Sequence, residues 1–145
     1  MKVVVFVKAT ADTEAGVMPE PGMMEAMMAF NQQLADAGVL GDADGLKPTA
    51  HAKRVRFDGD QTTVLDGPFA ETKELVAGYW LWTVKDIDEA VAWARKCPNP
   101  TPMGDGSGVL EIRPVYELAD FAEMVTPEIQ AQYDALHAAL DQRAD

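Results

Sequence analysis

The chain has 145 residues, and its 24 acidic and 12 basic side chains give a formal net charge of −12. A hydrophobic content of 48% with a single cysteine fits one globular domain with a core, and it excludes a disordered tail and a disulfide-stabilised scaffold. The acidic balance disfavours a nucleic-acid partner, because a phosphate backbone attracts cations, and no apolar run reaches the ~18 residues that a membrane helix needs.

The first part of the chain predicts a strand and a helix. Residues 2–8 (KVVVFVK) are rich in β-branched side chains, which is typical of a buried strand. After a polar loop, apolar residues recur at helical spacing and predict a helix from about residue 23 to Gly38. This stripe consists of Met23, Met24, Met27, Met28, Phe30 and Leu34. Its methionines form part of the core or, as the alternative, one wall of an adaptable ligand pocket.

The middle of the chain predicts a hairpin and a central strand. Residues 41–45 (GDADG) are expected to form a loop. Residues 52–57 and 62–65 are β-prone and flank an Asp-Gly turn at 58–59, which is a strong signal for a β-hairpin. Residues 76–84 (VAGYWLWTV) form the clearest strand. Strand alternation places Val76, Gly78, Trp80, Trp82 and Val84 on one of its faces.

The last part of the chain predicts a helix, a strand and a further helix. Asp86 is expected to cap a helix through the amide of Glu89, and the buried stripe of this helix is expected to consist of Ile87, Val91 and Ala94. Residues 109–117 are expected to form a final strand, and Pro114, which lacks a donor, predicts an edge position or a bulge there. Thr126 and Pro127 begin a terminal helix. The element order indicates a ferredoxin-like α+β fold with an extended β-hairpin and an added C-terminal helix.

Residues 66–74 (DGPFAETKE) form the most distinctive segment. Asp66, Gly67 and Pro68 favour a turn, which Phe69 anchors apolarly. The residues that follow bring two carboxylates, a hydroxyl and an amine together within four positions, at 71–74. These groups either form a solvated charged loop or converge in part on a pocket.

The segment 66–74 resembles the signature of the DGPF group within the YciI-like (YCII-related) family. Flanking segments are similar to that group as well, at 37–40, 45–48, 74–82, 88–93 and 111–115. The resemblance covers about residues 1–117 and leaves 118–145 as an acidic C-terminal extension with a helix. It implies a dimeric α+β barrel, in which two ferredoxin-like subunits pack sheet against sheet as a homodimer. We expect the extension to pack on the domain or on its dimer partner.

The resemblance also implies a small-molecule site. Some YciI-like proteins are enzymes, for example dehydrochlorinases of muconate-type compounds, in which a His–Asp pair is the suspected acid and base. This chain departs from that pattern, because its histidines, His51 and His137, lie outside the expected first strand and first helix. The candidate catalytic residues are therefore Glu71, Lys73, Glu74 and His51. The candidate ligand-binding residues are Asp66, Phe69, Thr72, Tyr79, Trp82 and Arg113. No Cys/His spacing supports a metal site, and no cofactor is expected.

Two functions fit these observations. The first is a cytoplasmic homodimer with a small-molecule pocket that carries out acid/base elimination or isomerisation of a small organic substrate. The second is a non-catalytic ligand-binding or regulatory protein, linked to a partner such as a sigma-factor system. Residues 114–145 carry seven acidic side chains and one basic side chain, so this tail is a candidate surface for a protein partner. The sequence does not decide whether the protein is an enzyme.

Overall fold

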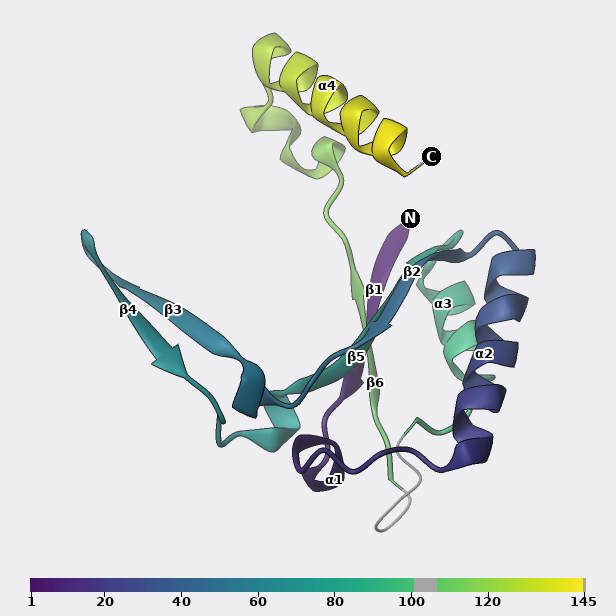
Figure 1. Cartoon of the computed structure of the whole chain (residues 1–145). Coiled ribbons are helices and arrows are strands. Elements are labelled where there is room, and N and C mark those ends of the chain that lie inside the picture. Colours follow the sequence, from purple (N-terminus) through teal and green to yellow (C-terminus); the bar gives the residue numbers. More distant parts are fainter. Residues whose placement is uncertain (101–106, 145) are drawn as a thin grey trace. The chain divides into compact units, whose positions relative to one another are not determined.

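The computed structural model describes residues 1–100 and 107–144 (Figure 1). The chain divides into two compact units, Met1–Val115 and Tyr116–Asp145. In the part of the chain that is described, no helix is both long enough and apolar enough to cross a membrane.

Four antiparallel strands form the main sheet of the first unit. The sheet has the order β2-β5-β1-β6. Its strands are β1 (Lys2–Lys8), β2 (Leu40–Gly45), β5 (Val76–Thr83) and β6 (Leu110–Pro114). Helix α2 (Pro21–Asp36) connects β1 to β2, and α3 (Ile87–Ala94) connects β5 to β6. This order and these connections are those of a ferredoxin-like fold, so the predicted α+β architecture is confirmed, as is the edge position of the strand that carries Pro114. The sheet does not close into a barrel within the described chain, because β2 and β6 are its two edges. The barrel formed by two subunits stays a prediction.

Two elements of the first unit differ from the expectation. Residues 41–45 were predicted to be a loop, but they belong to β2, where Leu40 and Ala43 lie opposite Trp82 and Trp80 of β5. Pairing with a strongly β-prone neighbour overrides the weak strand preference of Gly and Asp. The loop after β1 contains a short helix, α1 (Ala11–Glu14), whose first turn is capped by Thr10.

The core lies between the sheet and its two long helices. Val3, Val5, Trp80 and Trp82 point from β1 and β5 toward the helices and are buried. They pack against two buried side chains of α2 and one of α3. These are Phe30, Leu34 and Ala90. The predicted burial of one face of the central strand is thus confirmed, and both helices cover the same face of the sheet (Figure 1).

Helix α3 buries a different face from the predicted one. Its cap is as expected, because Asp86 Oδ1 accepts from the Glu89 amide at 2.9 Å, and this bond holds the pKa of Asp86 below its usual value. Ile87 and Val91, however, are exposed. The residues of this helix that contact the core are Ala90, Trp93 and Ala94, so Ala94 alone of the predicted stripe is confirmed. Packing the large indole of Trp93 against the core removes more apolar surface from water than burying Ile87 and Val91 would.

The other face of the main sheet is uncovered by α2 and α3. Strand alternation places the side chains of Val4, Phe6, Tyr79 and Leu81 on this face. Val4 of β1 lies opposite Leu81 of β5, and Phe6 lies opposite Tyr79. All four side chains are only half-buried. A second sheet packed against this face would bury them, as sheets do in layered folds.

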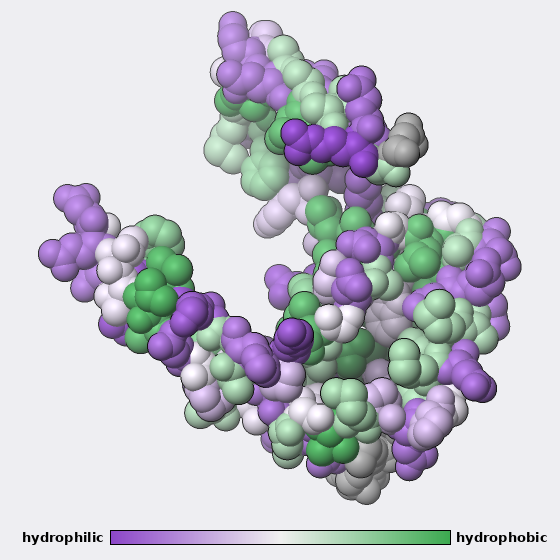
Figure 2. Space-filling view, viewed as in Figure 1, coloured by the Kyte–Doolittle hydropathy of each residue, from purple (hydrophilic) through white to green (hydrophobic). Residues whose placement is uncertain are grey.

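The predicted hairpin is present as β3 (Lys53–Asp58) and β4 (Gln61–Asp66). Gly59 has a φ of 59°, a left-handed conformation that glycine adopts without steric cost. Every residue of both strands is exposed. The exposed apolar side chains of the hairpin form a hydrophobic patch on its surface (Figure 2). They include Val55, Phe57 and Val64.

The second unit consists of two helical elements. A 3₁₀ segment, η3 (Leu118–Met124), precedes α4 (Pro127–Arg143). Thr126 caps α4 by accepting from the Ile129 amide at 3.2 Å, so the predicted start of this helix is confirmed. Within α4, the ring of His137 stacks on Tyr133 with ring centroids 3.9 Å apart.

Candidate functional site

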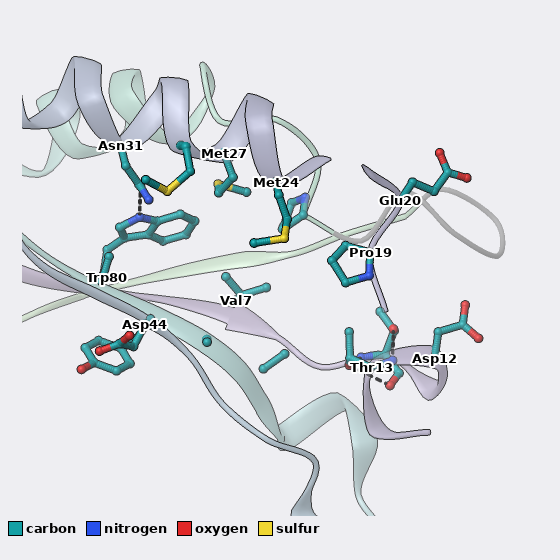
Figure 3. Close-up of a pocket in the computed structure, with 18 of the residues that line it drawn as sticks. Val7, Asp12, Thr13, Pro19, Glu20, Met24, Met27, Asn31, Asp44 and Trp80 are labelled. Carbon is teal, nitrogen blue, oxygen red and sulfur yellow. Dashed lines mark hydrogen bonds between the residues drawn. The ribbon is translucent and has the colours of Figure 1, made fainter. Parts of the chain in front are cut away.

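A cavity of about 490 Å³ lies between the main sheet and the N-terminal half of α2 (Figure 3). Its apolar wall is made by β1, β5 and α2. The side chains of this wall are Val7, Met24, Met27, Met28 and Trp80. Met24 and Met28 are 66% and 65% exposed, so they are not part of the core, and the stripe predicted for this helix is split between core and cavity. Methionine suits such a wall because its flexible thioether adapts to different ligand shapes.

Two glycines lie opposite each other on neighbouring strands at the cavity. Gly45 of β2 lies opposite Gly78 of β5, and both line the cavity. The neighbouring pair on the same side is Ala43 and Trp80, where an indole fills the space. A Cβ added at Gly45 would meet no atom within 4 Å. Gly45 therefore leaves open space beneath α2, whereas a Cβ at Gly78 would lie 3.1 Å from the Asp44 carbonyl oxygen, so Gly78 allows the two main chains to approach closely.

One amide is oriented beside the cavity. Asn31 of α2 accepts a hydrogen bond at Oδ1 from Trp80 Nε1 at 2.8 Å (Figure 3). Because the indole N–H can only donate, the carbonyl oxygen of Asn31 must face it, which turns Nδ2 elsewhere. Nδ2 has no partner among the described residues, so it is a donor that a bound molecule can use.

The end of the cavity away from Trp80 is polar. Thr10 and Thr13 line it and satisfy each other, since each main-chain N–H donates to the other residue's hydroxyl, at 2.8 and 3.2 Å. Asp12 and Glu20 lie at this same end, with their carboxylates directed away from Trp80 and the methionines (Figure 3). The site thus combines an apolar wall, one oriented amide and two carboxylates.

The distinctive segment 66–74 acts as a clamp in this structure. The Gly67 amide donates to the Ala52 carbonyl at 3.0 Å, and the Phe69 amide donates to Thr49 Oγ1 at 3.0 Å. A Cβ at Gly67 would lie 1.6 Å from the Thr49 carbonyl oxygen, so only glycine fits there. Thr49 in turn donates its hydroxyl to Glu14 at 2.6 Å. The segment ties the base of the hairpin to the end of α1.

Two predicted ligand-binding residues of this segment have partners within the chain. Asp66 forms an ion pair with Lys53 at the base of the hairpin. The Phe69 ring lies 3.8 Å from the guanidinium carbon of Arg54 in a cation–π contact. These contacts hold the hairpin to the clamp.

The predicted catalytic residues do not line the cavity. Glu71, Lys73 and Glu74 are exposed. His51 is also exposed, in the 3₁₀ turn that precedes β3. Thr72 is half-buried beside them. The expected convergence of these groups on a pocket beside the aromatic strand is therefore not found in the cavity of a single chain, and their roles stay predictions.

The remaining predicted ligand-binding residues lie in three different places. Tyr79 borders the cavity from β5, but strand alternation puts its side chain on the other face of the sheet from Trp80. There its hydroxyl donates to Asp42 at 3.0 Å, a bond that raises the pKa of Tyr79 above its usual value. Trp82 is fully buried in the core, where it packs against Phe30. Arg113 is exposed and forms an ion pair with Glu111 at 3.6 Å.

Sequence analysis missed the residues that shape the cavity. Gly45 lies in a segment that was predicted to be a loop, so the sequence did not predict that it would pair with Gly78. Asn31 carried a signal that could have been used, because it is a polar residue that follows Met27 by one helical turn on a largely apolar helix. The alternative interpretation of the methionines as a pocket wall pointed to the right helix.

The described residues contain no group of three or more His, Cys, Asp or Glu side chains that could hold a metal ion. Cys97 contacts the core, and its Sγ donates to the Pro98 carbonyl at 3.1 Å. Burial raises the pKa of the Cys97 thiol to about 11, so it is poorly suited to act as a nucleophile at neutral pH.

Comparison with known proteins identifies a family and a relative. The family model for the YCII-related domain matches residues 1–119. An uncharacterised protein of Rhizobium meliloti (strain 1021) is 38% identical over 93 residues, which are 64% of this chain and 73% of that protein.

Proposed function

The chain belongs to the YCII-related family, as the resemblance of its 66–74 segment predicted, and from this premise we propose that it binds a small organic molecule in the cavity beside Trp80. The observation that carries the proposal is the hollow above the Gly45–Gly78 pair, walled by methionines and provided with an oriented amide at Asn31. Apolar cavities of this size with a few convergent polar groups are typical of small-molecule sites.

Acid/base chemistry in this cavity is carried by carboxylates. Elimination and isomerisation both need a base, together with a donor that stabilises the negative charge developing on the substrate. Asp12 and Glu20 supply candidate bases at one end, and Asn31 supplies the donor near the other. Among the described residues that line the cavity there is no histidine, cysteine or lysine. Ligand binding is therefore the primary proposal, and catalysis by these carboxylates is its extension.

A homodimer built through the uncovered face of the main sheet accompanies this proposal. Val4, Phe6, Tyr79 and Leu81 make the centre of that face apolar, and a partner sheet would remove their half-buried side chains from water. The flanking strands β2 and β6 place charged residues on the same face, namely Asp42, Asp44, Glu111 and Arg113. The family resemblance implies the same packing. The cavity lies on the opposite, helix-covered side of the sheet, so dimerisation leaves it open to ligands.

A protein partner of the acidic C-terminal unit is the second candidate function, and one observation favours it. Taken by itself, this unit exposes the apolar side chains of Met124, Leu136 and Leu140 among its acidic residues. Exposed apolar side chains rimmed by charge are typical of protein-binding surfaces. A chain that ends at Val115 tests this proposal. Loss of a co-purifying partner with the dimer intact would support it, and loss of folding would show that the unit is structural.

The proposed ligand binding can be tested by a thermal-shift screen of small organic molecules against the full chain. A molecule that binds only the native state raises the melting temperature in proportion to RT ln(1 + [L]/Kd). The proposal expects hits that also change the tryptophan fluorescence, because Trp80 lines the cavity. A broad screen without a single concentration-dependent shift would contradict it.

A further inference from the structure

The end of the cavity beside Trp80 is walled by apolar side chains. Met24, Met27 and Met28 line it from α2, and Val7 lines it from β1 (Figure 3). The thioether of methionine is flexible and makes favourable contacts with aromatic rings. This end of the cavity therefore suits the apolar body of a ligand, and an aromatic ring in particular.

No charged side chain of the described lining faces this apolar end. Asp12 and Glu20 lie at the other end, and their carboxylates are directed away from Trp80 and the methionines (Figure 3). Asp44 lies opposite Tyr79, so strand alternation puts its side chain on the other face of the sheet from Trp80. The described lining contains no lysine, arginine or histidine. A charged group brought to the apolar end would lose water without gaining a counter-charge, which is costly.

An uncharged donor is available beside the apolar wall. The Trp80 N–H donates to Asn31 Oδ1 at 2.8 Å, and this bond leaves Asn31 Nδ2 without a partner among the described residues. The complement of an amide N–H in apolar surroundings is an acceptor without a charge, such as a carbonyl oxygen. Because Trp80 already fixes the orientation of the amide, a ligand does not have to order this donor when it binds.

We propose that the ligand of this cavity is an uncharged carbonyl compound, such as a ketone, an ester or an amide. Its apolar body lies against the methionines of α2, and its carbonyl oxygen accepts from Asn31 Nδ2. This ligand class rests on the proposed function and adds the chemistry by which the cavity recognises its ligand. A carboxylate offers similar oxygens but brings a charge that no cation of the described lining receives. An ammonium group brings a charge and offers a donor where Asn31 needs an acceptor.

The test uses four probes with one phenyl-alkyl body and different polar groups. Benzylacetone carries a ketone, hydrocinnamate a carboxylate, phenylpropylamine an ammonium group and butylbenzene no polar group. Each probe is titrated into the full chain at neutral pH, and binding is followed by tryptophan fluorescence, since Trp80 lines the cavity. Benzylacetone is expected to bind at least about tenfold more tightly than either charged probe, because a buried charge without a partner is costly.

The variant Asn31→Asp locates the donor. It keeps an acceptor for Trp80 but has no N–H at the δ position, so benzylacetone should lose about two- to tenfold in affinity, the contribution of one uncharged hydrogen bond. Butylbenzene, which contacts only the apolar wall, should lose less than about twofold. The matched control is Gln33→Glu, the same amide-to-carboxylate change at an exposed position of α2 that does not line the cavity. It should bind both probes like the wild type.

The infrared carbonyl stretch of bound benzylacetone tests the same contact in the wild type. A hydrogen bond lowers this frequency, so a value equal to that in an alkane would overturn the proposed ligand class even if Asn31→Asp failed to fold. A charged probe that binds most tightly, or a ketone affinity that Asn31→Asp leaves unchanged, also overturns the class and leaves ligand binding intact. The same holds if all four probes fail while other classes of molecule from the broad screen bind. Failure of the probes together with a screen without hits overturns both proposals.

Discussion

Asn31 and Trp80 join helix α2 to the central strand through one hydrogen bond, from the indole Nε1 to the amide Oδ1 at 2.8 Å. Trp80 is only 4% exposed, so its N–H has little access to water if this acceptor is lost. The bond therefore does two things at once. It stabilises the packing of α2 on the sheet, and it fixes the direction of the free amide donor beside the cavity.

Replacing Asn31 separates these two effects. Asn31→Leu leaves the Trp80 N–H unsatisfied, which should lower the free energy of unfolding by about 1–3 kcal/mol. Asn31→Asp keeps an acceptor for Trp80 and removes the donor, so it should retain more stability and still weaken ligands that accept from Nδ2. Urea unfolding measures the first effect and ligand titration the second. Equal stability of wild type and Asn31→Leu would contradict the role of this bond.

Gly67 is expected to be the least tolerant position of the 66–74 segment. A Cβ there would lie 1.6 Å from the Thr49 carbonyl oxygen, a main-chain atom that cannot move aside alone. Gly67→Ala should therefore destabilise the first unit by at least about 1–3 kcal/mol, the range for overpacked sites. Gly45→Ala is the control, because its Cβ would meet nothing within 4 Å. Thermal unfolding of both variants checks the prediction, and an unchanged melting temperature for Gly67→Ala would refute it.

Cys97 should react slowly in the folded protein. With its pKa raised to about 11 by burial, the thiol is almost entirely protonated at pH 8, and the thiolate is the reactive form. Alkylation by iodoacetamide should be slow in buffer and fast in urea. The raised pKa also means that the neutral thiol stabilises the fold fully below the unfolded pKa of about 8.5, and that this contribution is lost as the pH rises toward 11. Fast alkylation of the native protein at pH 8 would show that the thiol is not protected.

The uncovered sheet face should hold two chains together. Sedimentation of the wild type is expected to give twice the chain mass of 15.7 kDa. Phe6→Glu places a charge in the centre of this face and should produce a monomer, because burying an unpaired carboxylate is costly. Phe57→Glu is the control, since Phe57 lies on the exposed hairpin. A monomeric wild type, or a dimer that tolerates Phe6→Glu, would contradict the proposed interface.

Much of the fold was predictable because its signals are local. The alternation in residues 76–84, the Asp-Gly turn of the hairpin and the Asp86 cap each depend on a few neighbouring residues, and the structure confirms them. Strand β2 was not predictable in this way. Its Gly and Asp residues form a strand only because β5 offers a partner edge, which is a long-range effect.

The candidate site was less predictable than the fold. The segment 66–74 was singled out correctly as unusual, but its glycine and main-chain amides serve a structural clamp around Thr49. The cavity borders instead on the open space beside Gly45, which has no side chain, and on the close approach of Gly78 to β2, and both features arise only when the two strands are paired. Sequence alone gives no sign that two glycines 33 positions apart lie opposite each other.

The most direct measurement is the affinity of a screening hit for Gly45→Leu compared with wild type. Open space surrounds the Cβ position of Gly45, so a leucine there should fill the hollow without destabilising the sheet. Gly22→Leu, at an exposed glycine that also has open space and does not line the cavity, is the matched control. We expect Gly45→Leu to lose at least tenfold in affinity and Gly22→Leu to bind like the wild type. A Gly45→Leu variant that is folded and binds the ligand with unchanged affinity would show that the cavity is not the binding site.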